Sequence, residues 1–398
     1  MAVKFAQFGA VARVKPSARI ALPAGVNRGG IYWRYALAVG SYHALALLAF
    51  LPWFFSWTGV ALSILGASFF GVAGINLCYH RLLSHRSYRC PKWLEYFFAI
   101  VAVCCLQDTP ARWVAVHRKH HHRADEEPDP HSPLASLLWA YLGWLLIENT
   151  DLSRIALYDR YARDIIRDPF YVFVERAIVW IVLLSWAVFF AAGFAAGLLL
   201  GEGLMEAVQF GASVWLWGVI VRTLIAWHIT WSGNSFPHLW GYRNYETKDN
   251  SRNNIIVAII TWGEGFHNNH HAWPASASNC HRWWEVDATY LILRALVRCG
   301  LAWDVVLPGH ASHAQAIDSG QKLTSRDARL MSALPSIADI RRRNGMPVSH
   351  PAPHPRNVIF KSRAKLTAHL GFLKGDVDPI GGGEDGDGRN EHRPSADP

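Results

Sequence analysis

The chain has 398 residues, of which 51% are hydrophobic and 17% charged, and its formal net charge is +9. A soluble chain of this length would form two or three domains. Here the apolar residues gather in long uncharged runs, which excludes an ordinary soluble protein. A basic chain could bind nucleic acid, but these basic residues flank the apolar runs. We therefore assign them to membrane topology and anionic lipid, and we expect no nucleic acid partner.

The first apolar run follows a basic segment, residues 1–30, that we expect to be flexible. It extends from Tyr35 to Tyr79 and contains no Asp, Glu, Lys or Arg over 45 residues. As a helix it would be about 67 Å long, whereas the hydrocarbon core of a bilayer is about 30 Å thick, so it predicts two transmembrane helices. Two more uncharged or nearly uncharged runs follow. The four predicted spans are about 35–56, 59–79, 177–200 and 207–230.

Charge predicts the orientation of these spans. Residues 1–34 carry six basic residues and no acid, whereas the loop at 201–206 carries only acids. The positive-inside rule therefore places the N-terminus in the cytoplasm, and four spans return the C-terminus to the same side. We expect a multi-pass protein of the bacterial inner membrane without a cleavable signal peptide. The six cysteines include no CxxC pair, so we expect reduced thiols.

Several shorter segments are apolar but not long enough to cross a bilayer. We predict that they lie at the membrane interface, the last as an amphipathic helix. They are residues 93–106, 137–147 and 282–299. Residues 31–306 are thus assigned to one membrane domain, and 307–398 to a C-terminal extension that composition predicts to be disordered from about residue 376. Removal of 376–398 is predicted to leave activity intact.

Nine histidines fall in four clusters just outside the predicted spans. The clusters read HRLLSH, HRKHH, NSFPH and HNNHH. In HRKHH and HNNHH the histidines stand at i, i+3 and i+4, which places three imidazoles on one face of a helix. The pair in HRLLSH is five residues apart and is expected to straddle a helix end. The nine are His80, His85, His117, His120, His121, His238, His267, His270 and His271.

Nine neutral nitrogen ligands are too many for one metal ion and about right for two. Nitrogen-rich sites suit Zn, Cu, Fe or Ni, and a structural zinc site would use only four ligands. No nucleophile-elbow motif, phosphate-binding glycine loop or haem motif is present in the sequence. His122 and His131 lie next to the second cluster, and the sequence does not decide whether either is a direct ligand. Five isolated histidines are expected to be ordinary: His43, His228, His281, His310 and His313.

At this point the chain resembles a known family, the membrane fatty acid desaturases of the Δ9 type, which act on acyl-CoA or acyl-lipid substrates. The similarity runs from about Trp33 to Asp304. It rests on the three histidine boxes in their order, on DEEPDPHSP after the second box, on the NSxxH element, and on GEGFHNNHHAWP.

The resemblance implies a di-iron centre whose ligands are the nine histidines, with Asn234 contacting one metal through water. It implies no bound haem or flavin, O2 as co-substrate, and two electrons from an external donor such as a ferredoxin or a cytochrome b5-like protein. The product would be a cis double bond at Δ9. The bend of the acyl tunnel would be formed by Gln107, Trp113, Thr230 and Trp231. One departure is Ala115-Val116, where animal acyl-CoA members carry Arg-Asp that contacts the CoA head group, and it favours lipid-esterified chains.

We therefore expect an all-α integral membrane protein with four transmembrane helices and a cytoplasmic helical cap that carries a histidine-ligated di-metal site. A di-iron hydroxylase or ketolase on the same scaffold is the alternative, which would insert oxygen instead of leaving an alkene. A metal transporter would place ionisable residues inside the spans, and here the clusters lie outside them.

Overall fold

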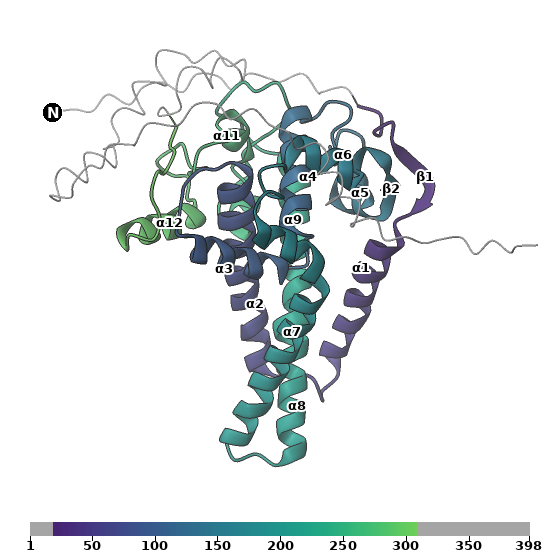
Figure 1. Cartoon of the computed structure of the whole chain (residues 1–398), viewed down its shortest axis with the longest axis vertical. Helices are drawn as coiled ribbons and strands as arrows, with labels where there is room; N and C mark the ends of the chain where they lie inside the picture. The colour runs from purple at the N-terminus through teal and green to yellow at the C-terminus, as the bar shows by residue number, and fades with distance from the viewer. Residues whose placement is uncertain (1–18, 309–398) are drawn as a thin grey trace, which may run out of the picture. The chain divides into compact units, whose positions relative to one another are not determined.

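The computed structural model describes residues 19–308, and their regular secondary structure is mostly helical (Figure 1). Predictions about residues 1–18 and 309–398, including the C-terminal extension, lie outside the described residues. The longer helices are α1 (Trp33–Ala46), α2 (Trp57–Phe70), α3 (Lys92–Val103), α4 (Pro110–Arg123), α6 (Arg154–Tyr161), α7 (Pro169–Leu199), α8 (Leu204–Trp215), α9 (Arg222–Ser235) and α12 (Ala288–Arg298). The short helices are α5 (Trp144–Leu146), α10 (Ile255–Ile260) and α11 (His267–Ala272).

Tighter or wider helical turns continue several of these helices. They are the 3₁₀ turns η1 (Leu47–Phe50), η4 (Thr150–Leu152) and η6 (Phe236–His238), and the π-helical segments η2 (Gly71–Ser84), η3 (Trp139–Gly143) and η5 (Leu216–Val221). As a result α2 runs into η2, and α8 runs through η5 and α9 into η6, without a break.

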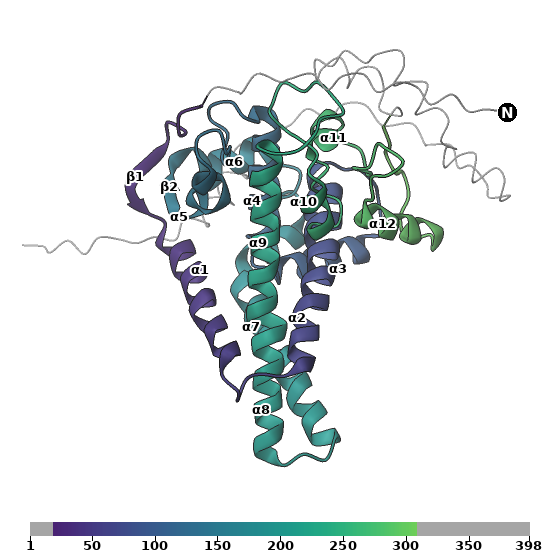
Figure 2. The same cartoon turned by 180° about the vertical axis from the view of Figure 1, so that it is seen from behind.

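Three continuous helices are long and apolar enough to cross a membrane: Trp57–Ser84, Pro169–Leu199 and Leu204–His238. They correspond to the second, third and fourth predicted spans. Each is longer than predicted, with 28, 31 and 35 residues. A bilayer core needs only about 20. The extra turns carry these helices beyond membrane thickness, to the end where α4, α6, α11 and α12 gather (Figures 1 and 2).

The region of the first predicted span, 35–56, forms a shorter helix. After α1 the chain makes one 3₁₀ turn, and Leu51 is then extended, with ψ 133°. Leu51 precedes Pro52, and the ring of a proline disfavours helical geometry in the residue before it. The helical part therefore ends at Phe50 instead of residue 56.

A small antiparallel sheet was not predicted. Strand β1 (Val26–Ile31) pairs with β2 (Ile147–Asn149), with Val26 opposite Asn149 and Ile31 opposite Ile147. Residues 26–30 of the segment predicted to be flexible thus form part of a strand. The predicted interfacial helix 282–299 begins later than expected, at Ala288, because the Asp287 side chain accepts a hydrogen bond from the Tyr290 amide and caps the helix there.

Small residues let α7 and α8 pack closely. A methyl group added at Gly193 would lie 2.7 Å from Cβ of Val214, and one at Gly197 would lie 2.8 Å from Cα of Ala207. Close backbone approach of this kind is how helices associate in a membrane, where lipid tails are as apolar as the side chains. Beside this pair, Leu216, Ile220 and Trp227 form a buried cluster that α1 covers.

Candidate metal centre

Three of the histidines share one face of α4, as their spacing predicted. Thr109 begins this helix by accepting a hydrogen bond from the Arg112 amide, and Pro110 occupies the first turn, where its missing N–H costs nothing. The rings of His117 and His121 lie 4.6 Å apart. The helix predicted for HRKHH is therefore confirmed.

The pair in HRLLSH uses a different geometry. His80 lies in the π-helical segment η2 and His85 caps its end, where the His85 amide donates to the His80 carbonyl over 3.1 Å. A π-helical turn joins residues five apart, so it brings both rings to one side, with centroids 4.9 Å apart. The prediction that this pair straddles a helix end is confirmed.

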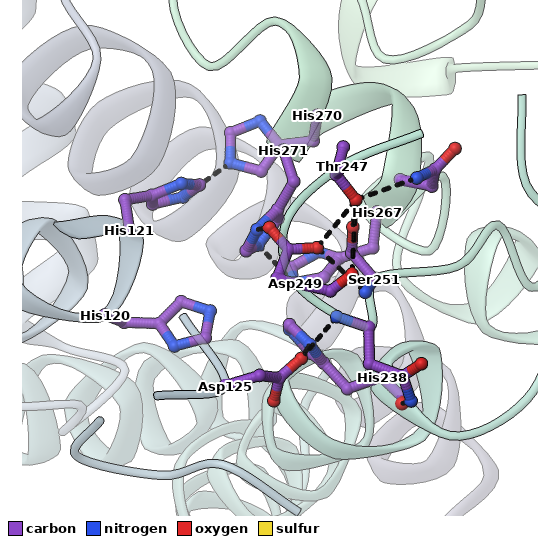
Figure 3. A network of polar contacts seen from close by, with 12 residues as sticks. His120, His121, Asp125, His238, Thr247, Asp249, Ser251, His267, His270 and His271 are labelled. Carbon is purple, nitrogen blue, oxygen red and sulfur yellow. Dashed lines mark hydrogen bonds and ion pairs between the residues drawn. The ribbon is translucent and has the colours of Figure 1, made fainter. Parts of the chain in front are cut away.

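The nine histidines separate into two compact groups. The first group is His80, His85, His117, His121 and His270, and the second group is His120, His238, His267 and His271. Within each group the possible ligand nitrogens all lie within 4.8 Å of one another. Neighbours in sequence enter different groups, because adjacent residues of a helix point about 100° apart. Figure 3 shows this divergence for His120 and His121 on one helix and for His270 and His271 on another.

The Nε2 atoms converge within each group. In the first group, Nε2 of His270 lies 3.0 Å from Nε2 of His80 and 2.9 Å from Nε2 of His121. In the second group, the Nε2 atoms of His120 and His238 are buried and have no hydrogen-bond partner within the described chain. Buried polar atoms are rarely left unpaired. Converging nitrogens with free lone pairs are what a bound cation would satisfy.

Carboxylates contact four of these rings at Nδ1, the nitrogen that points away from the centre of the group. The Nδ1 of each ring donates to one carboxylate: His80 to Glu264 at 2.8 Å, His120 to Asp129 at 2.9 Å, His238 to Asp125 at 2.8 Å, and His271 to Asp249 at 2.9 Å. A proton on Nδ1 leaves the lone pair on Nε2, facing the group. Carboxylate partners of this kind fix ligand tautomers in metalloproteins.

Sequence reasoning missed these four carboxylates. For three of them a signal was present, since Asp125 and Asp129 lie in DEEPDPHSP and Glu264 in GEGFHNNHH. A histidine ligand buried in a protein needs an acceptor for its second nitrogen, so acids adjoining a box are candidates. Asp249 stands 22 residues from His271, and no local pattern marks it.

Electrostatics keep three of the imidazoles neutral. Burial, and then the neighbouring rings, lower the pKa of His85, His117 and His267 well below the ordinary value. Burial raises the pKa of the Glu264 carboxyl, but the charge of Arg81 and the hydrogen bonds from Arg81 and His80 outweigh it and bring this pKa to about 2. At neutral pH these three ligands are therefore neutral, and Glu264 is ionised.

The two histidines whose role the sequence left undecided, His122 and His131, have different surroundings in the structure. His122 is outside both groups and bonds the Tyr161 hydroxyl at 3.0 Å. His131 is 4% exposed, stacks on His120 with centroids 4.4 Å apart, and leaves its Nδ1 unpaired within the described chain. With His120 and Asp129 it forms a third, smaller set of possible ligands.

Three of the histidines predicted to be ordinary have hydrogen-bond partners in the structure. His43 and His228 bond each other through Nε2 at 3.2 Å, and His281 bonds Tyr245 at 3.0 Å. His310 and His313 lie outside the described residues.

A cavity of about 470 Å³ adjoins the first group. This volume falls within the roughly 300–1,000 Å³ of small-molecule sites. The cavity reaches His117, and Asn234 also lines it. The Gln107 amide donates to the Thr230 hydroxyl at 2.8 Å, and Trp113 stacks on His117 with centroids 4.9 Å apart. All four residues predicted for the tunnel bend line this cavity: Gln107, Trp113, Thr230 and Trp231.

Comparison with known proteins agrees with this geometry. Residues 53–303 match the family model of the fatty acid desaturases. The chain is 38% identical over 311 residues to an sn-2 palmitoyl-lipid 9-desaturase of Nostoc sp., covering 77% of this chain and 99% of the relative. It is 39% identical over 282 residues to an sn-1 stearoyl-lipid 9-desaturase of Synechocystis sp., covering 71% and 82%. It is also 38% identical over 274 residues to an acyl-CoA 5-desaturase of Anemone leveillei, covering 69% and 79%.

Proposed function

This chain belongs to the fatty acid desaturase family and is therefore an oxidoreductase that desaturates fatty acids. From that premise we propose that it forms a cis double bond at Δ9 of a saturated acyl chain, and that it does so at a di-iron centre. The observation that carries the proposal is the position of the acyl-sized cavity, which ends beside the first histidine group. In the overall reaction, two adjacent methylenes each lose a hydrogen. One O2, two electrons and two protons are consumed, and two waters leave.

The proposed ligands are the nine histidines, with five in the first group and four in the second. Asn234, which lines the cavity beside the first group, would contact one of the two metals through a water. Imidazole suits Zn, Cu, Fe and Ni, but zinc has no redox chemistry, so an enzyme that reduces O2 at its metal needs one of the others. Iron is our choice because of the family. Bound there, it supplies the O2 reduction that removes hydrogen from an unactivated methylene.

The protein's own part is to position the chain and exclude water. In the wall of the cavity, the Gln107 amide donates to the Thr230 hydroxyl at 2.8 Å, so these two polar groups pair with each other beside the acyl chain. Trp113 packs flat against His117. A chain that passes Trp113 therefore meets the first histidine group next. The carboxylates behind His80, His120, His238 and His271 hold the lone pairs of these four rings in place before substrate arrives.

In the membrane, we propose α1 with η1 as a fourth crossing. Residues 33–50 would span about 27 Å as a helix, close to the roughly 30 Å core. The positive-inside rule then places both termini and the histidine groups on the cytoplasmic side of a bacterial inner membrane. Because no cofactor motif for electron storage occurs in the sequence, the electrons would come from a ferredoxin or a cytochrome b5-like protein.

The test is the fatty acid profile of a host that expresses the chain together with a redox donor. Gas chromatography–mass spectrometry of derivatised methyl esters should find new cis monoenes at Δ9. His267→Ala should abolish them, whereas His122→Ala, a histidine outside both groups, should not. Hydroxylated products would replace this proposal with the hydroxylase alternative. An unchanged profile with both metals bound would refute the acyl substrate.

A further inference from the structure

The cavity carries more charge than an acyl chain needs. Three arginines and one aspartate line it, so its wall has a formal charge of +2 when the histidines are neutral. These residues are Arg34, Arg112, Arg154 and Asp108. A saturated hydrocarbon chain gains nothing from cations, and a bound chain that covered an unpaired charge would cost free energy. The excess charge therefore points to an anionic group at one end of the ligand.

Arg112 does not provide the excess. Its Nε donates to Asp108 at 3.0 Å and its Nη1 to the Leu152 carbonyl at 3.0 Å. It is thus paired within the protein. By contrast, neither Arg34 nor Arg154 makes a hydrogen bond or an ion pair with any residue in the range 19–308. These two guanidinium groups account for the unpaired +2.

Tertiary structure brings these two arginines to one cavity across 120 residues of sequence. The pairing of β1 with β2 places the start of α1 beside the segment that leads into α6. At this junction the Tyr32 amide donates to the Leu146 carbonyl at 2.8 Å. Arg34 lies in the first turn of α1, and Arg154 is the first residue of α6. Arg34 and Arg154 therefore both lie near the N-terminal end of α1.

Elsewhere, the wall of the cavity faces lipid. Val179 and Leu183 line the cavity on α7 and are 60% and 44% exposed. They belong to a helix long and apolar enough to cross the membrane. Exposed apolar side chains on such a helix face hydrocarbon. The cavity thus borders the bilayer on one side and carries, at another point, two arginines that are unpaired within residues 19–308. A membrane lipid with an anionic headgroup fits this arrangement, because its acyl chain can enter from the bilayer while its headgroup contacts the arginines.

We propose that Arg34 and Arg154 bind the phosphate of a glycerophospholipid whose acyl chain lies in the cavity. This inference rests on the proposed function, since it names the class of substrate for that site. A guanidinium offers paired N–H donors that match phosphate oxygens, and such charge-assisted bonds are about twice as strong as neutral ones. Neutral glycolipids with the same acyl chains lack this group and gain nothing from the two arginines.

Acyl-CoA also carries phosphates, so the experiment must separate the two sources. The full chain in detergent would be titrated with dipalmitoyl phosphatidylglycerol, with palmitoyl-CoA and with dipalmitoyl monogalactosylglycerol, and bound ligand counted by native mass spectrometry. Arg154→Gln and Arg34→Gln are the test variants. Arg160→Gln is the matched control, because it lies on the same helix and does not line the cavity.

We expect each test variant to bind phosphatidylglycerol about ten- to a hundred-fold more weakly, which is the loss of one charge-assisted contact. Binding of the galactolipid should not change, and neither should the control. In turnover, KM for the phospholipid should rise with kcat nearly constant, because the headgroup contact is the same before and during reaction. Arg154→Lys should recover part of the affinity.

Three results would overturn the inference. Equal affinity of both lipids for the unsubstituted protein is one, and unchanged phospholipid binding by both variants is another. A loss confined to palmitoyl-CoA would assign the arginines to CoA instead. Failure of the proposed function is distinguishable, because it would appear as lipid binding that depends on the arginines without any alkene product.

Discussion

Replacing Arg81 with methionine removes the cation that two buried carboxylates share. Arg81 is 1% exposed and donates four hydrogen bonds. Two go to Glu264, one goes to Asp287 at 3.0 Å, and one goes to the Ala277 carbonyl at 2.7 Å. Glu264 in turn holds the Nδ1 of His80 at 2.8 Å. The arginine therefore supports a metal ligand through one intermediate residue.

Methionine fills much of the same volume but pairs with neither carboxylate. Removing one partner of a buried ion pair costs about 3–5 kcal/mol, a large part of the roughly 5–15 kcal/mol that stabilises a typical fold. Without Arg81, the pKa of Glu264 should rise from about 2. A protonated Glu264 would hold His80 less firmly, so metal affinity of the first group should fall about 10–100-fold.

Thermal unfolding in detergent and iron content by mass spectrometry measure the two effects. Arg86→Met is the control, because this side chain is 67% exposed and its ion pair with Asp164 is worth roughly 0–1 kcal/mol. The double variant Arg81→Met, Asp287→Asn should recover stability, since it removes one uncompensated charge. If Arg81→Met were as stable and as rich in iron as the control, the reasoning would be refuted.

Three further outcomes follow from the same geometry. Asp125→Ala removes the acceptor of the His238 Nδ1–H and should lower metal affinity of the second group about 10–100-fold. The number of iron ions per chain should then fall from about two toward one. An unchanged number of iron ions per chain would contradict this. Thr230→Val removes the nearer of the two acceptors of the Gln107 amide and leaves only the Ala226 carbonyl at 3.4 Å, at a cost of roughly 1–3 kcal/mol. Gas chromatography should then show less Δ9 product or a displaced double bond, and an identical profile would argue against this pair as the tunnel bend. Chelation of the metal should abolish turnover, and Fe²⁺ but not Zn²⁺ should restore it, because zinc has no redox chemistry; recovery with zinc would exclude the iron assignment.

The sequence alone determined the local features of this protein. Uncharged runs predicted the three long helices, because spanning a bilayer requires about 20 apolar residues in succession. The i, i+3, i+4 spacing of HRKHH predicted one helix face with three imidazoles. Resemblance to a family supplied the four cavity residues, which the structure brings together.

Only the tertiary structure decided how these parts combine. The assignment of His120 and His121 to different groups depends on which helix faces which, and spacing along one helix does not contain that information. Asp249 reaches His271, and Arg34 and Arg154 reach one cavity, through packing and strand pairing between distant segments. Helical periodicity is set by the backbone over a few residues, whereas contacts between segments are set by how whole helices pack. The ligand types were therefore readable from the sequence, but their division into two groups, the role of Asp249 and the meeting of the two arginines were not.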